Sequence, residues 1–224
     1  MWVKICGNTN LEDAAVAADL GADAVGFVFA ESKRQVTAAQ VAAIAPHLPP
    51  GVERVGVFCR HSADEIAETV RQAGLTAVQL HGGLDNGLSE RLAERFAGTV
   101  RMIQTLHWHV TLKDNAGHLV RQIEHIAAAG ITDRILIDSK VGAATGGTGV
   151  SFDWAAAQSV FASASAGMRL ILAGGLKPDN LAQALAQLHP WGVDVASGVE
   201  ESPGRKDPAL VKRFIAIAHG AKTP

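Results

Sequence analysis

The sequence predicts an α/β protein, a (β/α)8 TIM barrel that forms one single domain over residues 1–224. Three observations lead to this prediction. Short runs rich in Val and Ile alternate with longer Ala-rich amphipathic stretches. The alternation repeats eight times, with about 28 residues for each unit. No linker, charge block or low-complexity tract divides the chain. An open doubly wound sheet is the alternative, but it usually has fewer strands and needs no closure.

The predicted strands are short runs that are apolar without alternation, as in parallel sheets buried on both faces. They cover residues 2–6, 23–28, 53–57, 76–80, 99–104, 134–138, 169–173 and 192–196. Helices are predicted, from apolar residues at three- and four-residue spacing, over 10–20, 37–46, 62–73, 87–96, 116–128, 151–163, 178–187 and 207–219. Four of these helices begin with a capping signal, at Thr37, Ser62, Ser151 and Asp179.

Composition and charge exclude several classes of function. A formal net charge of −2 with scattered Lys and Arg offers no surface for nucleic acid. The two cysteines, Cys6 and Cys59, cannot form a disulfide framework, which indicates a reducing compartment. Residues 3–6 already read as a strand, so no signal peptide is expected, and no apolar run reaches about 18 residues. We therefore expect a soluble, cytoplasmic protein without membrane contact, and a monomer because no exposed apolar stripe stands out.

Glycines gather where the last strands end, which is where a TIM barrel places its chemistry. The set comprises Gly146, Gly147, Gly149, Gly174, Gly175 and Gly198, the last of which follows Ser197. Backbone N–H groups can converge on an anion only where side chains leave space. A tight turn could explain any one glycine, but their joint position in the loops after strands 6, 7 and 8 favours a phosphorylated small-molecule ligand.

Cys6 and Asp138 end the first and sixth predicted strands, so both lie at the barrel mouth. Proton abstraction next to an imine or carbonyl needs one group that takes a proton and one that gives it. Cys6 would need a local field that favours the thiolate, for which Lys4 is one source. Burial at an apolar strand end would keep Asp138 protonated. His107-Trp108-His109 has metal-like residue types, but no third ligand has suitable spacing, so we expect a solvated loop and no metal.

The chain resembles the phosphoribosylanthranilate isomerase family in several motifs spread from residue 3 to about residue 214. These motifs include Lys4-Ile5-Cys6-Gly7, Val78-Gln79-Leu80-His81-Gly82, Ile137-Asp138-Ser139, Ala173-Gly174-Gly175, and Ser197-Gly198-Val199-Glu200 through Gly204-Arg205-Lys206-Asp207. Each motif alone is weak, but their order and spacing are specific.

The resemblance implies a cofactor-free Amadori rearrangement of N-(5′-phosphoribosyl)anthranilate in tryptophan biosynthesis, on a TIM barrel. It implies that Asp138 is the general acid, that Cys6 is the general base and that Arg34 holds the anthranilate carboxylate. The loops with Gly147, Gly149, Gly174, Gly175, Ser197 and Gly198 would bind the sugar phosphate, and Gln79 and His81 would line the mouth. One departure is Lys33, where the family usually has proline, and this leaves the position of Arg34 open.

Two alternatives remain at this point. A sister barrel acts on a histidine-pathway aminoaldose, and some barrels accept both substrates, but that sister enzyme has an aspartate where Cys6 stands. A catalytically silent barrel that binds a phosphate ligand would need neither Cys6 nor Asp138. The presence of both residues favours the enzyme.

Overall fold

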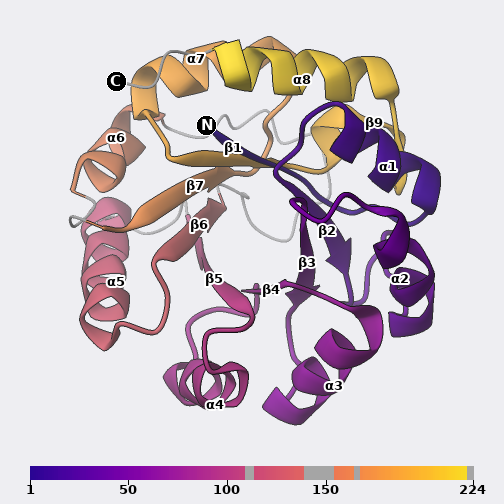
Figure 1. Ribbon diagram of the computed structural model, residues 1–224. Coiled ribbons are helices and arrows are strands. Elements are labelled where there is room, and N and C mark those ends of the chain that lie inside the picture. Colours follow the sequence, from indigo (N-terminus) through magenta and orange to yellow (C-terminus); the bar gives the residue numbers. More distant parts are fainter. Residues whose placement is uncertain (109–113, 139–153, 164–166, 221–224) are drawn as a thin grey trace.

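Eight parallel strands close into a barrel with the order β1 to β8, and helices surround it (Figure 1). This is the computed structural model of the chain, and it describes residues 1–108, 114–138, 154–163 and 167–220. Its strands are β1 (Trp2–Ile5), β2 (Ala24–Val28), β3 (Glu53–Phe58), β4 (Ala77–Leu80), β5 (Arg101–His107), β6 (Arg134–Asp138), β7 (Arg169–Ala173) and β8 (Gly192–Val195). Its α-helices are α1 (Leu11–Asp19), α2 (Ala38–Ile44), α3 (Ala63–Ala73), α4 (Asn86–Phe96), α5 (Asn115–Ala129), α6 (Trp154–Ala162), α7 (Pro178–Leu188) and α8 (Pro208–Gly220). The TIM barrel predicted from the sequence is confirmed.

Helix starts follow the predicted capping chemistry at two of four places. Thr37 and Ser62 each accept a hydrogen bond from the backbone three residues on, in complete capping boxes. Asp179 is wrong as a cap, because α7 begins one residue earlier at Pro178 and its N-cap is Lys177. Proline is favoured at a first helical position, since its missing N–H would have no partner there. Ser151 lies outside the described residues.

Four short elements were not predicted from the sequence. A 3-10 helix η1 (Ala45–His47) extends α2, and a second one, η2 (Ser197–Val199), follows β8. An antiparallel hairpin of β9 (Glu200–Ser202) and β10 (Arg205–Lys206) comes next. Each element has two or three residues, which is too few to show a hydrophobic period.

Strand alternation decides which side chains face the barrel interior. Successive strand residues point to opposite faces. One buried cluster contains Trp2, Ala24, Val55, Ala77, Ile103, Leu136, Ile171 and Ala173. Their sequence neighbours, such as Val3 and Val25, belong to the larger cluster that includes helix residues. Positions two residues on from members of the first cluster therefore also point inward, and these include Lys4, Gln79 and Asp138.

The amino end of the barrel is closed by aromatic rings and a buried arginine. Trp2 and Trp191 stack at 5.5 Å between ring centroids. The guanidinium carbon of Arg134 lies 5.5 Å and 5.2 Å from the two ring centroids. Arg134 also pairs with Glu53 at 2.6 Å. Side chains thus fill the amino end of the barrel, so a binding site is expected at the carboxyl end.

Among the described residues, no helix has both the length and the apolar character that crossing a membrane requires.

Candidate active site

A cavity of about 350 Å³ opens at the carboxyl end of the barrel strands. Nine of the predicted site residues line it: Cys6, Arg34, Gln79, His81, Asp138, Gly174, Gly175, Ser197 and Gly198. Gly147 and Gly149 lie outside the described residues. The nine come from loops or strand ends after six different strands, so the closed barrel is what brings them together.

Cys6 lies directly after β1, and its side chain is buried in the cavity wall. Its backbone N–H donates to the carbonyl of Val195, a bond of 2.8 Å that continues the pairing of β1 with β8. A Cβ at Gly26 on β2 would lie only 2.7 Å from the Cys6 sulfur and 2.9 Å from the Lys4 Cε. Glycine at position 26 therefore provides the space that the thiol and the ammonium group occupy.

Lys4 is fully buried, and its ammonium group is held by two side chains. It donates to the Gln79 Oε1 at 2.8 Å and to the Asp194 Oδ1 at 2.9 Å. Burial alone would lower the pKa of Lys4, but the Asp194 carboxylate and Cys6 outweigh this effect and raise it. Lys4 is consequently a fixed cation beside the cysteine. Gln79 lies at the cavity as predicted, and one of its contacts is this ammonium group.

The positive charges expected to favour the Cys6 thiolate are present, but burial has the larger effect on the pKa of the thiol. Burial raises the pKa of Cys6, and the charge of Asp194 adds to this. Lys4 and Lys206 act in the opposite direction without cancelling the shift. The thiol is therefore mostly protonated at neutral pH, and a thiolate formed there would be a stronger base than in water.

Asp138, at the end of β6, lies opposite a pair of histidines. The His81 Nε2 is 3.8 Å from the Asp138 Oδ2. The His81 and His107 rings meet edge to face at 4.8 Å, and the His107 Nε2 lies 3.0 Å from the His81 carbonyl oxygen. The solvated loop expected for His107-Trp108-His109 is wrong for the first two residues, because β5 extends to His107 and Trp108 is buried. His109 lies outside the described residues. One potential ligand atom from each of His81, His107 and Asp138 lies within 4.8 Å of the others, a grouping that the sequence analysis missed.

The loops after β7 and β8 touch at glycine positions. Gly174 and Gly175 have φ values of 87° and 66°, which favour glycine. A Cβ at Gly198 would lie 1.8 Å from the Leu176 carbonyl oxygen, so only glycine fits there. The backbone N–H groups of Gly175 and Ser197 donate no hydrogen bond to another described residue. Such donors at a cavity wall suit an anion.

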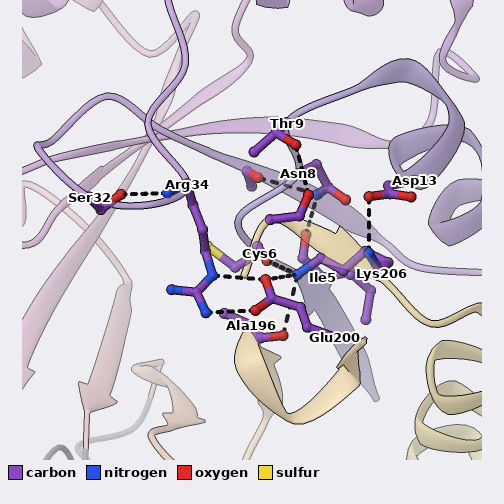
Figure 2. A network of polar contacts seen from close by, with 12 residues as sticks. Ile5, Cys6, Asn8, Thr9, Asp13, Ser32, Arg34, Ala196, Glu200 and Lys206 are labelled. Carbon is purple, nitrogen blue, oxygen red and sulfur yellow. Dashed lines mark hydrogen bonds and ion pairs between the residues drawn. The ribbon is translucent and has the colours of Figure 1, made fainter. Parts of the chain in front are cut away.

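Arg34 reaches the mouth despite Lys33, and it is held there by Glu200 (Figure 2). Its Nε donates to the Glu200 Oε1 at 2.8 Å, and its Nη2 donates to the Oε2 at 2.6 Å. Its backbone N–H also donates to the Ser32 hydroxyl at 3.1 Å. These contacts fix the loop without the proline that the family usually has.

Lys206 completes this network from β10. Its ammonium group donates to the Glu200 Oε1 at 3.0 Å, to the Cys6 carbonyl at 2.5 Å and to the Ala196 carbonyl at 3.3 Å. Burial would raise the pKa of Glu200, but the hydrogen bond from Arg34 and the charge of Lys206 lower it. Burial lowers the pKa of Lys206 against the opposing effect of Glu200. Both residues belong to the sequence motif quoted above, but nothing in the sequence assigned them a role.

Comparison with known proteins agrees with this geometry. The family model for N-(5′-phosphoribosyl)anthranilate (PRA) isomerase matches residues 3–216. A protein of that name from Pelobacter propionicus is 42% identical over 218 residues, covering 96% of this chain and 94% of its own. A crystal structure of phosphoribosyl anthranilate isomerase with reduced 1-(o-carboxyphenylamino)-1-deoxyribulose 5-phosphate aligns with a TM-score of 0.79 and 35% identity, over 99% of this chain and 100% of that one.

A third similar protein is the dimeric enzyme of Thermotoga maritima, crystallised as mutually generated monomers. It aligns with a TM-score of 0.79 and 34% identity, over 99% of this chain and 100% of that one. The resemblance inferred from short motifs is thus confirmed over nearly the whole length of the sequence. The chain belongs to the N-(5′-phosphoribosyl)anthranilate isomerase family.

Proposed function

We propose that this chain converts N-(5′-phosphoribosyl)anthranilate to 1-(2-carboxyphenylamino)-1-deoxyribulose 5-phosphate, the isomerisation for which its family is named. One observation carries the proposal: a single cavity holds a thiol, a carboxyl group, an arginine and two glycine loops. These are the groups needed to move two protons on a substrate that bears a carboxylate at one end and a phosphate at the other.

The reaction begins with opening of the sugar ring. Asp138 gives a proton to the ring oxygen as the bond between this oxygen and C1′ breaks, and the anilino nitrogen supplies the electron pair that forms a protonated Schiff base. Cys6, as the thiolate, then removes the proton from C2′, and the C–H electron pair forms the double bond of an enolamine. The enolamine tautomerises to the ketone product. Both proton transfers are thus assigned to side chains that line the cavity.

The substrate's two anionic groups define its orientation in this proposal. The phosphate lies at Gly174, Gly175, Ser197 and Gly198, which line the cavity and bring backbone N–H donors to its wall. The aryl carboxylate lies at Arg34, whose planar fork matches it. Gln79 and His81 line the same cavity. With the anions fixed, the sugar carbons lie between Cys6 and Asp138.

Turnover of freshly generated substrate, followed by loss of its fluorescence, tests the assignment. Cys6→Ala and Asp138→Asn should each lower kcat by about 10²–10⁴-fold, the usual contribution of a general acid or base. Asp19→Asn is the matched control for Asp138→Asn, because Asp19 is exposed at the last residue of α1 and is not among the residues that line the cavity. Full activity in Cys6→Ala would refute the role of the thiol. A wild type that binds the reduced product analogue without turning substrate over would instead indicate a silent binding barrel.

We also propose, as the sequence predicts, that the chain is monomeric and cytoplasmic. Leu11 is the one large hydrophobic side chain that is exposed among the described residues. Sedimentation at micromolar concentration should therefore give the mass of one chain, near 23.4 kDa. A mass of twice this value would show instead that the assembly follows the dimeric relative.

A further inference from the structure

The β9–β10 hairpin links the loops that follow β1, β2 and β8. The Thr9 hydroxyl donates to the Gly204 carbonyl at 2.7 Å, and the Lys206 backbone N–H donates to the Asp13 carboxylate at 3.0 Å. Glu200, the first residue of the hairpin, pairs with Arg34 across 166 positions of sequence. Its carboxyl group is nearly buried, with a side-chain exposure of 3%. The hairpin therefore fixes the arginine relative to the loop that carries Cys6.

The guanidinium of Arg34 uses only one of its edges in this contact. A guanidinium has five N–H donors in one plane, and Glu200 accepts two of them, from Nε and Nη2. The remaining terminal nitrogen points away from Glu200 (Figure 2). Because the group is rigid and planar, fixing the inner edge also fixes the direction of the outer edge. That outer edge offers parallel donors from both terminal nitrogens, which suit a second carboxylate.

The stem of Arg34 is also confined. A Cβ at Gly7 would lie 2.6 Å from the Arg34 Cδ, so the side chain lies against the bare backbone that follows Cys6. The φ of Gly7 is 78°, a conformation that favours glycine. The aliphatic stem of Arg34 thus packs against the Gly7 backbone, while its guanidinium is held by Glu200.

The three side chains that are in ionic contact at Glu200 do not balance in charge. Glu200 is a single carboxylate between two cations, Arg34 and Lys206. The ammonium group of Lys206 is held by Glu200 and two backbone carbonyls, so its charge faces inward. The excess positive charge is therefore presented by Arg34, on the cavity side. This arrangement fits an anionic partner rather than a closed structural ion pair.

We propose that Glu200 is a positioning residue that aims the outer edge of Arg34 at the aryl carboxylate of the substrate. The inference depends on the proposed function, because it assigns the carboxylate of that same substrate to Arg34. Glu200 does not touch the substrate, and it acts through the direction of the guanidinium.

Two ligands separate this role from a general structural one. The first is the reduced 1-(o-carboxyphenylamino)-1-deoxyribulose 5-phosphate, and the second is the same compound without the carboxylate. Calorimetry gives the dissociation constant of each ligand for each variant. The ratio of the two constants is the preference of that variant for the carboxylate ligand. Glu200→Gln keeps the size of the side chain but removes its charge, and it should lower the preference for the carboxylate ligand about 10-fold. Binding of the second ligand should stay as in the wild type.

The matched control is Glu201→Gln, which makes the same change at the exposed neighbouring residue. It should keep the wild-type preference. Glu200→Asp keeps the charge on a shorter side chain and should restore part of the preference. If Glu200→Gln has the wild-type preference, or weakens both ligands equally, Glu200 does not position Arg34. Thermal unfolding verifies that each variant is folded. If Glu200→Gln does not fold, the ligand preference of Glu200→Asp is compared with that of the wild type instead.

A double-mutant cycle tests whether Glu200 acts through Arg34. In an Arg34→Gln background, Glu200→Gln should change the ligand preference no further, because the group on which it acts is gone. An equal loss in both backgrounds would overturn the proposal. Turnover by the wild type is measured separately, so an inactive wild type would refute the proposed function while the ligand ratios still report on Glu200.

Discussion

The buried ammonium groups of Lys4 and Lys206 and the partly buried carboxylate of Asp194 all act on Cys6, and these charges make its ionisation the property to measure. Burial raises the pKa of the thiol, while Lys4 and Lys206 lower it. A raised pKa means that the thiolate fraction is small at neutral pH and grows as the pH increases. We therefore expect kcat/KM to rise with pH beyond the neutral range. A profile that is flat from neutral to alkaline pH would contradict a thiolate base.

Replacing Lys4 tests which cation supports the thiolate. Lys4→Met removes the positive charge nearest to the thiol, so the pKa of Cys6 should increase and the alkaline limb of kcat/KM should move to higher pH. Activity at neutral pH should decrease, because a smaller fraction of Cys6 is then present as the thiolate. Thiolate absorbance in the ultraviolet, measured in a Cys59→Ala background so that Cys6 is the one cysteine left, gives the titration. Lys212→Met, at an exposed lysine on α8, is the control and should leave both the profile and the titration unchanged.

Single residues at strand ends could be predicted, while their partners could not. Cys6 and Asp138 follow from the rule that parallel barrels place chemistry at the carboxyl ends of their strands, and Gln79 was implied by the family resemblance. Glu200 and Lys206 could not be assigned in this way, because their partners Arg34 and Cys6 lie 166 and 200 positions away. No local pattern encodes which distant side chain a buried charge will meet.

At the scale of elements, the loops after β7 and β8 depend on close backbone contact. Gly198→Ala would place a Cβ 1.8 Å from the Leu176 carbonyl oxygen, so the two loops must separate. We expect the substrate KM and the Kd of inorganic phosphate as an inhibitor to increase about 10-fold or more, because the backbone donors no longer converge. Gly220→Ala, at the end of α8 with open space around its Cβ position, should leave both constants unchanged. Unaltered phosphate inhibition in Gly198→Ala would place the phosphate elsewhere.

Regular elements were predictable because their period is repeated several times. The long helices show it well, and predicted residues 116–128 compare with Asn115–Ala129 in the structure. The end of β5 was missed, because His107 and Trp108 are polar or bulky and resemble a loop. Only the neighbouring strand β6, whose Asp138 carbonyl accepts from the Trp108 backbone N–H at 2.9 Å, extends the pairing that far.

At the scale of the whole molecule, the closed amino end should govern stability without affecting catalysis. Arg134→Met removes a buried cation that stacks on Trp2 and Trp191 and pairs with Glu53. We expect a loss of about 3 kcal/mol in the free energy of unfolding, with kcat/KM unchanged below the transition. Arg101→Met, which removes the exposed partner of the same glutamate, should cost about 1 kcal/mol or less. If urea denaturation gives the same loss of unfolding free energy for both variants, burial of Arg134 contributes nothing to stability.

We also propose that the whole chain unfolds as a single domain. The eight strands form one closed sheet, so no strand can leave without opening the pairing on both of its sides. Circular dichroism and tryptophan fluorescence should then give the same urea midpoint for the wild type. Two separate midpoints would show that part of the chain unfolds independently.

The pairing of β1 with β8 also determines when the protein can become active during its synthesis. Within this chain, Cys6 leaves the ribosome well before Val195, Glu200 and Lys206, which contact its loop. Until β8 emerges, a nascent chain holds a sheet with two unpaired edges that can recruit other strands. Cys6 is thus made early but reaches its place in the site only when β8 has paired with β1, and the sheet edges stay unpaired during this interval.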